Sequence, residues 1–332
     1  MDVKHFAREQ APEASPVATA SKILDELLRW RRRSDHRDDD DNVRKFHLPR
    51  LQKAVETATP LTFVLPAFPA KSPNPRKVLG ILPDAAERIA LSFLSNLCQR
   101  LTQYYPPGAR IVLCSDGHVF ADTIRVADAT VARYQAHLYE LAQQIDASRI
   151  QVINLHDVLP TSYASADYEQ ARAYLINHFG KSADVTRAEL MADEMGRAHY
   201  RAITRFMFED GLTPDYNGSR NALQMDSRQR AIEVVRRSRA WGGLLEQAYP
   251  EALRLSIHPQ APDSPKFGIH LSEATDSWLT PWHAVAVDVG GKFKLMKRQE
   301  AEKAGGRIVH VDGHPSHFVV DDDGKMRLAA QE

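Results

Sequence analysis

Basic and hydroxyl side chains gather in a segment stiffened by three prolines, Phe68-Pro-Ala-Lys-Ser-Pro-Asn-Pro-Arg-Lys77. Lysine offers a point charge, whereas arginine can grip a phosphate or a carboxylate with two parallel hydrogen bonds. Each proline fixes its own φ, so the segment has little freedom left to lose when a ligand binds. We therefore predict an anion-binding site formed by Lys71, Ser72, Arg76 and Lys77. The alternative is a surface loop whose charges face water.

A second polar group, Ser115-Asp-Gly-His118, follows the apolar run that ends at Cys114. Gly117 permits a tight turn or a close approach of a ligand to the backbone. Asp116 can fix an amino or hydroxyl group, and His118 can exchange a proton near neutral pH. We predict that Asp116 and His118 are catalytic, and that Ser115 and Asp122 bind substrate. The alternative is a turn with a capping aspartate.

A third polar group comes late in the chain, where His258 ends an apolar run and Lys266 follows it. The imidazole is a candidate acid or base, and the lysine can bind phosphate or activate a carbonyl group. Trp282 and His283 enter the next apolar run, and Trp282 can wall a pocket for an aromatic ligand. A structural histidine and a core tryptophan are the alternatives here.

Several known motifs are absent from the sequence. It has no G-x-G-x-x-G dinucleotide fingerprint, no G-x-x-x-x-G-K-[ST] phosphate loop and no G-x-S-x-G nucleophile elbow. Its histidines and cysteines do not have the H-E-x-x-H or C-x-x-C spacing of metal ligands. The sequence therefore predicts an enzyme without metal or cofactor that works by acid–base and imine chemistry.

Strands and helices alternate in the part of the chain that carries these groups. Apolar runs predict strands at 61–68, 110–114 and 150–155, and spacing of i, i+3 and i+4 predicts helices at 84–104 and 128–146. This order is typical of a Rossmann-like α/β fold, in which helices cover both faces of a mainly parallel sheet. Ligands bind beyond the carboxyl ends of such strands, where the first two polar groups lie.

The remaining chain adds helices and hairpins. We predict a helix over 21–33, a solvated loop in the charged run 31–41, a long helical region over 165–250 and a strand over 253–258. Two C-terminal hairpins are predicted, one turning at Gly290-Gly291 and one at Asp321–Gly324. The predicted division is a tail and helix (1–50), a Rossmann-like catalytic core with a helical insertion (51–260) and a smaller β-rich region (261–332).

Composition narrows the possible partners and location. The 332 residues carry 43 Lys and Arg against 43 Asp and Glu, so no global field attracts nucleic acid or an anionic membrane. Cys98 and Cys114 lie in apolar runs and are expected to be small core residues of a reduced, intracellular protein. The N-terminus lacks the apolar core of a signal peptide, and no stretch has 18 uninterrupted apolar residues. We expect a cytoplasmic protein.

The motifs together resemble the isonitrile (isocyanide) synthases of bacteria and the related fungal dityrosine and isocyanide biosynthesis proteins. The Phe68–Lys77 segment is the most specific match, and the resemblance extends over roughly residues 55–290. Further matching positions are Leu82-Pro83-Asp84, Glu87, Ser115-Asp116-Gly117, Phe120 and Asp122, with weaker ones at Tyr200-Arg201, Arg205-Phe206, Ser256–Pro259 and Trp282-His283.

The resemblance implies a reaction and its substrates. Members of this family convert the α-amine of an aromatic amino acid to an isonitrile, and the added carbon comes from C2 of ribulose 5-phosphate. No metal, nucleotide or pyridoxal phosphate is needed, and a separate iron- and 2-oxoglutarate-dependent oxygenase usually acts on the product. Asp116, His118 and His258 are then the acid–base candidates, and Lys266 or Arg205 would hold the amino acid carboxylate or a second face of the phosphate.

The sequence leaves several choices open. L-tyrosine is the preferred substrate because the resemblance is closest to tyrosine-modifying members, and L-tryptophan is the alternative. A homodimer is expected only because it is the commonest assembly of such enzymes. The competing interpretations are a Rossmann-like methyltransferase or another nucleotide-dependent enzyme, and a binding or scaffold protein without catalytic activity.

Overall fold

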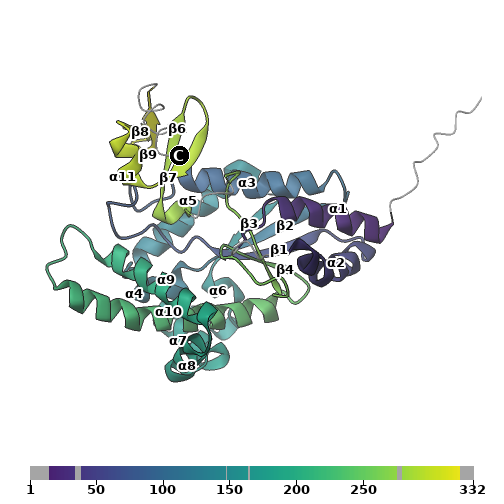
Figure 1. The fold of residues 1–332 in the computed structure, drawn as a ribbon, viewed down its shortest axis with the longest axis horizontal. Coiled ribbons are helices and arrows are strands. Elements are labelled where there is room, and N and C mark those ends of the chain that lie inside the picture. The colour runs from purple at the N-terminus through teal and green to yellow at the C-terminus, as the bar shows by residue number, and fades with distance from the viewer. Residues whose placement is uncertain (1–14, 34–38, 147, 164, 275–278, 322–332) are drawn as a thin grey trace, which may run out of the picture.

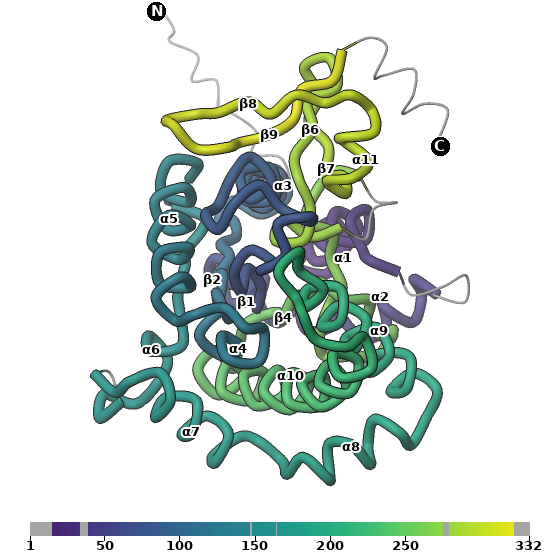
Figure 2. Tube along the Cα trace, turned by 90° about the vertical axis from the view of Figure 1, so that its left-hand side faces the viewer, coloured from purple at the N-terminus to yellow at the C-terminus, as the bar shows by residue number. Residues whose placement is uncertain are grey.

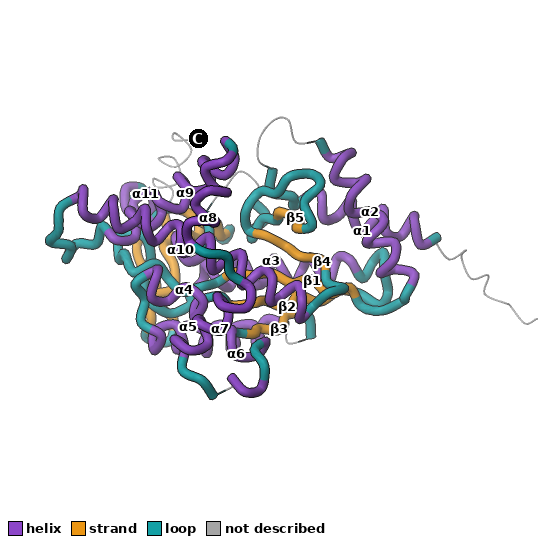
Figure 3. Tube along the Cα trace, turned by 90° about the horizontal axis from the view of Figure 1, so that it is seen from below, coloured by secondary structure: helices purple, strands orange, loops and turns teal. Residues whose placement is uncertain are grey.

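The computed structural model describes residues 15–33, 39–146, 148–163, 165–274 and 279–321 (Figure 1). Five parallel strands form the central sheet in the order β3-β2-β1-β4-β5, which Figure 3 shows from below. This confirms the predicted mainly parallel α/β fold. The strands are β1 (Leu61–Ala67), β2 (Ala109–Ser115), β3 (Ile150–Ile153), β4 (Leu253–Ser256) and β5 (Lys266–Gly268).

Helices cover both faces of this sheet because its strands are apolar on both sides. Phe63 and Leu65 of β1 point into one core and Val64 into the other. The first core is closed by α1 (Pro16–Arg29), α2 (Asp40–Glu56), α3 (Ala85–Leu101) and α5 (Asp128–Asp146). The second is closed by α4 (Gly117–Ile124), α6 (Leu155–Val158), α7 (Tyr168–Phe179) and α10 (Arg220–Ala248). Figure 2 shows α3 and α10 on opposite sides of the strands.

The long helical region predicted over 165–250 is present between β3 and β4. After the short 3-10 turn η1 (Thr161–Tyr163) it contains α7, α8 (Ala183–Ala192), α9 (Glu194–Gly211) and α10. Helix α9 packs along α10, and Met207 and Asp210 are its buried residues. The insertion therefore leads α9 back towards the segment that follows β1, which its Asp210 contacts directly.

The C-terminal strands form a separate mixed sheet with the order β7-β6-β9-β8. Its elements are the 3-10 turn η2 (Pro281–His283), β6 (Val285–Val289), β7 (Phe293–Met296), α11 (Arg298–Lys303), β8 (Arg307–Val311) and β9 (His314–Val320). The predicted hairpin at Gly290-Gly291 is confirmed, and both glycines have positive φ. Ala284 and Ala286 pack this sheet against Ala86 of α3.

The position of the second C-terminal hairpin was predicted wrongly. Strands β8 and β9 pair across Asp312-Gly313, where both residues have positive φ, as a tight Asp-Gly turn requires. The predicted turn at 321–324 comes after β9, and its residues 322–324 lie outside the described residues. The prediction placed the turn at the run of aspartates, whereas the chain turns at the Asp312-Gly313 pair.

The N-terminal region also differs from the prediction. Helix α1 begins at Pro16 rather than at residue 21, and the predicted loop over 31–41 ends where α2 begins at Asp40. The Asp39 carboxylate caps α2 by accepting from the Asp41 N–H at 2.8 Å. Arg31 and Arg32 are buried instead of solvated, because this segment lies along β5 and the Arg32 N–H donates to the Gly268 carbonyl. Residues 1–14 and 34–38 lie outside the described residues.

Cys98 and Cys114 are buried, unbridged core residues, as predicted. Strand β5 joins the central sheet although it follows residue 260, and the predicted domain boundaries stay a prediction. Among the described helices, none is both long and apolar enough to cross a membrane.

Candidate active site

The segment after β1 is held tightly against the end of β2. Phe68 has a φ of 61° and is fully buried against Trp282, with ring centroids 5.2 Å apart. Its carbonyl accepts a hydrogen bond from the Ser115 hydroxyl at 2.8 Å. A Cβ on Gly117 would lie 1.9 Å from the Pro69 carbonyl oxygen, so only glycine allows this approach. A positive φ in a bulky residue marks a backbone held by its surroundings, as is common at functional sites.

Lys71 is buried and its charge is compensated inside the protein. Its Nζ lies 2.9 Å from Asp84 Oδ2 and 2.7 Å from Glu87 Oε2, and it donates to the Pro281 carbonyl at 3.1 Å. Burial alone would lower the pKa of Lys71, but the two carboxylates overcome it and raise that pKa. Tyr134 donates to the other oxygen of Glu87. Lys71 therefore links the Phe68–Lys77 segment to α3 and η2. Its charge is paired within the protein and is not left for a ligand.

Asp210 of α9 gathers three of the predicted substrate-binding residues. Its Oδ1 accepts from the Ser72 hydroxyl at 2.7 Å and from Lys77 Nζ at 2.5 Å, and its Oδ2 lies 3.0 Å from His283 Nε2. Burial alone would raise the pKa of Asp210, but His283 and Lys77 hold it well below its ordinary range. The Phe206 ring stacks on His283 at 5.3 Å. Asp210 therefore joins α9 to the Phe68–Lys77 segment.

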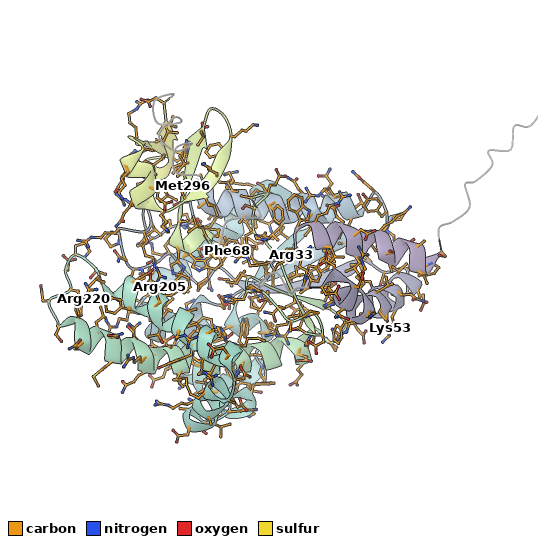
Figure 4. All side chains as sticks on the ribbon, viewed as in Figure 1. Arg33, Lys53, Phe68, Arg205, Arg220 and Met296 are labelled. Carbon is orange, nitrogen blue, oxygen red and sulfur yellow. The ribbon has the colours of Figure 1, made fainter. Side chains whose placement is uncertain are left out.

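Three residues that were predicted to bind substrate have exposed side chains. Arg205 is on the outer side of α9, where its side chain is 81% exposed and pairs with Glu209, whereas Phe68 lies near the centre of the molecule (Figure 4). Asp122 is half-exposed and is held by Arg237 through two hydrogen bonds. Arg76 is exposed, and its side chain forms no ion pair with another described residue. The geometry brings neither Arg205 nor Asp122 to the strand ends.

Asp116 is the most unusual carboxyl group at the strand ends. It stands between β2 and α4 but makes no capping hydrogen bond with its side chain. Its Oδ1 is buried and, among the described residues, has no hydrogen-bond partner. Burial raises the pKa of Asp116 to about 7. A carboxyl group with such a pKa can take up and release a proton near neutral pH, which is the property of a general acid or base.

His118 belongs to a cluster formed with residues of α5 and α7. Its Nδ1 lies 2.8 Å from Asp128 Oδ1, and Arg172 holds both that carboxylate and the His118 carbonyl. The Tyr168 ring stacks on the imidazole at 3.5 Å, and His156 lies on the same tyrosine. Burial lowers the pKa of His118, partly offset by Asp128. The neutral imidazole therefore donates from Nδ1, and its buried Nε2 has no hydrogen-bond partner in the described chain.

His258 and Lys266 belong to a basic group at the edge of the sheet. His258 follows β4 and keeps exposed surface, yet surrounding protein atoms desolvate it and, with His199, Arg32 and Lys266, lower its pKa to about 4. The His199 ring of α9 lies 5.8 Å from the His258 ring. Burial and the nearby Arg254 lower the pKa of Lys266 as well.

The structure thus divides the predicted residues among three places and adds others that the sequence had not indicated. Ser72, Lys77 and His283 meet at Asp210, Asp116 stands at the end of β2, and His258 and Lys266 lie together beyond β4 and in β5. Trp282 is a core residue, only 4% exposed. The residues missed are Asp210, Glu87, Asp128, Arg172, Tyr168 and His199.

Some of the missed residues had a detectable signal. Asp84 and Glu87 have the spacing of a capping box, which the structure contains at the start of α3. Asp210 lies 138 residues from Ser72, and His199 is also far along the chain from His258, so no local spacing indicates either residue. Across the described residues, no three His, Cys, Asp or Glu side chains form a group suited to a metal ion.

Comparisons with known proteins agree with this architecture. A sequence model of the pyoverdine/dityrosine biosynthesis protein family matches residues 51–309. The chain is 48% identical to the L-tyrosine isonitrile synthase of Xenorhabdus nematophila, over 92% of this chain and 93% of that protein. It is 38% identical to an L-tryptophan isonitrile synthase of Fischerella ambigua, over 85% of this chain and 87% of the relative.

A solved structure is similar over nearly the whole chain. The crystal structure of the PvcA protein of Pseudomonas aeruginosa superposes with a TM-score of 0.87 at 49% identity, over 91% of this chain and all of that one. The residues matched by the family model, 51–309, include the strand ends and the helical insertion. The chain therefore belongs to the pyoverdine/dityrosine biosynthesis protein family and is an enzyme of the isonitrile synthase kind.

Proposed function

We propose that this protein converts the α-amine of L-tyrosine to an isonitrile and takes the added carbon from ribulose 5-phosphate. Tyrosine is preferred because the relatives named L-tyrosine isonitrile synthases are 48% and 49% identical, against 38% for those named for L-tryptophan. The sugar phosphate follows from the family resemblance of the sequence motifs.

The buried carboxyl group of Asp116 is the observation that carries the chemical part of the proposal. An amine attacks a ketone only when it is deprotonated, and the condensation to an imine then releases water. The two C–C bonds of the former C2 must then break, and further protons must leave, before the isonitrile is complete. Asp116, whose pKa is raised to about 7 by burial, can accept a proton at neutral pH without being committed to another hydrogen-bond donor at Oδ1. Its position beyond β2 is where ligands of parallel sheets bind.

The two predicted catalytic histidines have different surroundings. His258 is neutral at pH 7, because its pKa is lowered to about 4, so it can accept a proton or a hydrogen bond beyond β4. His118 is held by Asp128 and covered by Tyr168. We therefore place His258 beside the substrate and assign His118 to holding α4, and with it Asp116, in position.

An isotope experiment tests the activity. Purified protein is incubated with L-tyrosine and ribulose 5-phosphate labelled with ¹³C at C2, and the product is examined by mass spectrometry and ¹³C NMR. The expected product is a tyrosine-derived isonitrile that carries the label in the isonitrile carbon. Absence of that label would overturn the proposed donor, and a faster reaction with L-tryptophan would overturn the proposed amino acid.

A thermal-shift experiment separates the competing classes of function. Ribulose 5-phosphate at a hundred times its dissociation constant should stabilise the protein by about 2.7 kcal/mol. S-adenosylmethionine, ATP and NAD should give no shift. Stabilisation by one of these nucleotides alone would favour a nucleotide-dependent enzyme instead.

Replacing Asp116 by asparagine tests the proposed base. Asp116→Asn keeps the shape of the side chain and removes a desolvated carboxyl group, so the fold should be at least as stable as the wild type. The turnover number should fall by about 10²- to 10⁴-fold, the usual contribution of a general base. Steady-state kinetics with a parallel thermal melt measure both, and a turnover number within threefold of wild type would show that another group accepts the proton.

A further inference from the structure

Basic side chains from four elements converge at the β4–β5 edge of the central sheet. Lys266 and Arg254 are paired residues on β5 and β4, and His258 follows β4. Helix α9 contributes His199, and Arg239 of α10 is close enough to lower the pKa of both His199 and Lys266. We call these five residues, Lys266, Arg254, His258, His199 and Arg239, the edge cluster.

Helix α10 passes very close to the two strand cations of the edge cluster. A Cβ on Gly242 would lie 2.8 Å from Arg254 Nη2 and 4.0 Å from Lys266 Nζ. Glycine at this position leaves room for both side chains between the helix and the sheet. Only a small part of Arg254 is exposed, and Lys266 is partly buried. The two cations are therefore partly covered by the helix instead of projecting freely into solvent.

Carboxylates pair with two of the three permanent cations of the edge cluster and leave the third, Lys266, without an ion pair among the described residues. Arg254 pairs with Glu246 at 3.1 Å, and Arg239 pairs with Glu189 at 2.5 Å. Among the described residues, no carboxylate lies within ion-pair distance of Lys266 Nζ. Lys266 therefore stands beside other cations without an ion pair of its own, and a bound anion would relieve that repulsion.

The segment after β1 has the opposite balance. Lys71 is enclosed by Asp84 and Glu87, and Lys77 by Asp210, so both lysines already have anionic partners. Only Arg76 of that segment extends an uncompensated charge, and it does so from an exposed position. A phosphate placed there would have to displace buried carboxylates or bind to a single surface arginine.

The edge cluster lies next to the point where a ligand of this sheet is expected. The strand order reverses between β1 and β4, and the crevice at such a point binds ligands in open α/β sheets. His258 follows the carboxyl end of β4 at this crevice, whereas Arg254 lies within β4, opposite Val64 of β1, and Lys266 begins β5. A phosphate held by Lys266 and Arg254 would therefore lie below the strand ends, with His258 between it and the crevice.

From these observations we propose that the edge cluster is the phosphate-binding subsite for the sugar-phosphate substrate, with Lys266 as its principal ligand. Arg254 and His258 flank the phosphate, and the sugar extends from it past His258 towards the crevice at the strand ends. This inference rests on the proposed function for the identity of the ligand, but the affinity for a phosphate group can be measured without turnover.

Isothermal titration calorimetry with inorganic phosphate, ribulose 5-phosphate and unphosphorylated ribulose tests the subsite. Lys266→Met should weaken binding of both phosphate ligands by at least about tenfold, the typical effect of losing a charged hydrogen-bond partner. Binding of ribulose and of tyrosine should not change. Lys266→Arg should restore part of the affinity, because the positive charge returns. Lys53→Met is the matched control, since Lys53 is 73% exposed on α2 and pairs with Glu251 instead of belonging to the edge cluster (Figure 4).

A measurement on the unaltered protein keeps the test independent of how the variants fold. Reductive methylation followed by peptide mass spectrometry gives the reaction rate of each lysine. Phosphate, but not chloride at the same ionic strength, should slow the modification of Lys266 several-fold and leave Lys53 unaffected. Equal rates with and without phosphate would argue against the subsite.

Three outcomes would overturn the subsite. Lys266→Met could bind phosphate as wild type does, Arg76→Ala could lose phosphate affinity instead, or Lys266→Met could lose tyrosine affinity, which would make the edge cluster a carboxylate site. Failure of the proposed function looks different. If no labelled isonitrile forms while Lys266 still governs phosphate affinity, the subsite stands and the reaction is another one on a phosphorylated substrate.

Discussion

Lys71 and Lys266 are the same type of residue in two regions of the molecule, yet their electrostatic environments are opposite. Both are withdrawn from water. Lys71 lies between two carboxylates and a carbonyl, and the pKa of its amine is raised. Lys266 lies beside Arg254 with no ion-pair partner among the described residues, and the pKa of its amine is lowered. Lys71 is already paired within the fold, whereas Lys266 is free of such a pair among the described residues and can bind an anion.

The difference shows that a count of cations does not locate an anion site. The segment after β1 holds more basic residues in sequence than β5 does, but its lysines meet Asp84, Glu87 and Asp210. Burial in a compensated pair stabilises a joint, whereas burial beside like charges stores repulsion that a ligand can relieve. The two regions should therefore respond in opposite ways to the same substitutions.

The largest expected effect is the loss of stability in Lys71→Met. The substitution leaves Asp84 and Glu87 buried without their cation, and removing one member of a buried ion pair typically costs about 3–5 kcal/mol. Urea denaturation monitored by circular dichroism measures the free energy of unfolding. Arg76→Ala, in the same segment but exposed, should change it by no more than about 0.5 kcal/mol. Equal stabilities of the two variants would contradict the compensated joint.

A smaller loss is expected from Asp210→Asn, which weakens the contact between α9 and the segment after β1. At pH 7 it should cost about 2 kcal/mol, because the group that accepts from Ser72 and Lys77 loses its negative charge, and the amide nitrogen that replaces the other oxygen cannot accept a hydrogen bond from His283. The folded-state pKa of Asp210 is depressed below the ordinary value of about 3.9. Its stabilisation is therefore complete above pH 4 and is lost as the pH falls further.

The pH dependence distinguishes this contact from a simple packing defect. Between pH 4 and pH 2 the wild type should lose stability more steeply than Asp210→Asn, so that the two unfolding free energies converge. Chemical denaturation at closely spaced pH values measures this. Parallel curves with a constant offset would mean that the carboxylate charge of Asp210 contributes nothing.

Much of the fold could be predicted because its signals are local. Apolar runs gave β1, β2, β3 and β4 nearly to the residue, and helical spacing gave α3 and α5, the latter with its bounds unchanged at Asp128 and Asp146. Helix α2 was missed because it is mostly polar and begins in the run of aspartates that looked like a loop. The burial of Arg31 and Arg32 depends on the distant strand β5, which no local pattern reveals.

The candidate site was harder to predict than the fold because compensation of charge is a long-range property. The sequence correctly places Asp116 and His258 directly after strands, since strand ends follow from apolar runs. It could not show that Asp210, 138 residues from Ser72, takes up the charge of Lys77. Nor could it show that His118, two residues from Asp116, is held by Asp128.

The smallest expected effect, and the sharpest test of the comparison, is the stability of Lys266→Met. Because burial and Arg254 already disfavour the charged amine, its removal should leave the free energy of unfolding unchanged or raise it by up to about 1 kcal/mol. The same substitution at Lys71 should cost several kcal/mol, so the pair is measured side by side by urea denaturation in phosphate-free buffer. Added phosphate should then stabilise the wild type more than Lys266→Met. A loss above about 2 kcal/mol without phosphate would show that Lys266 is compensated within the fold, as Lys71 is.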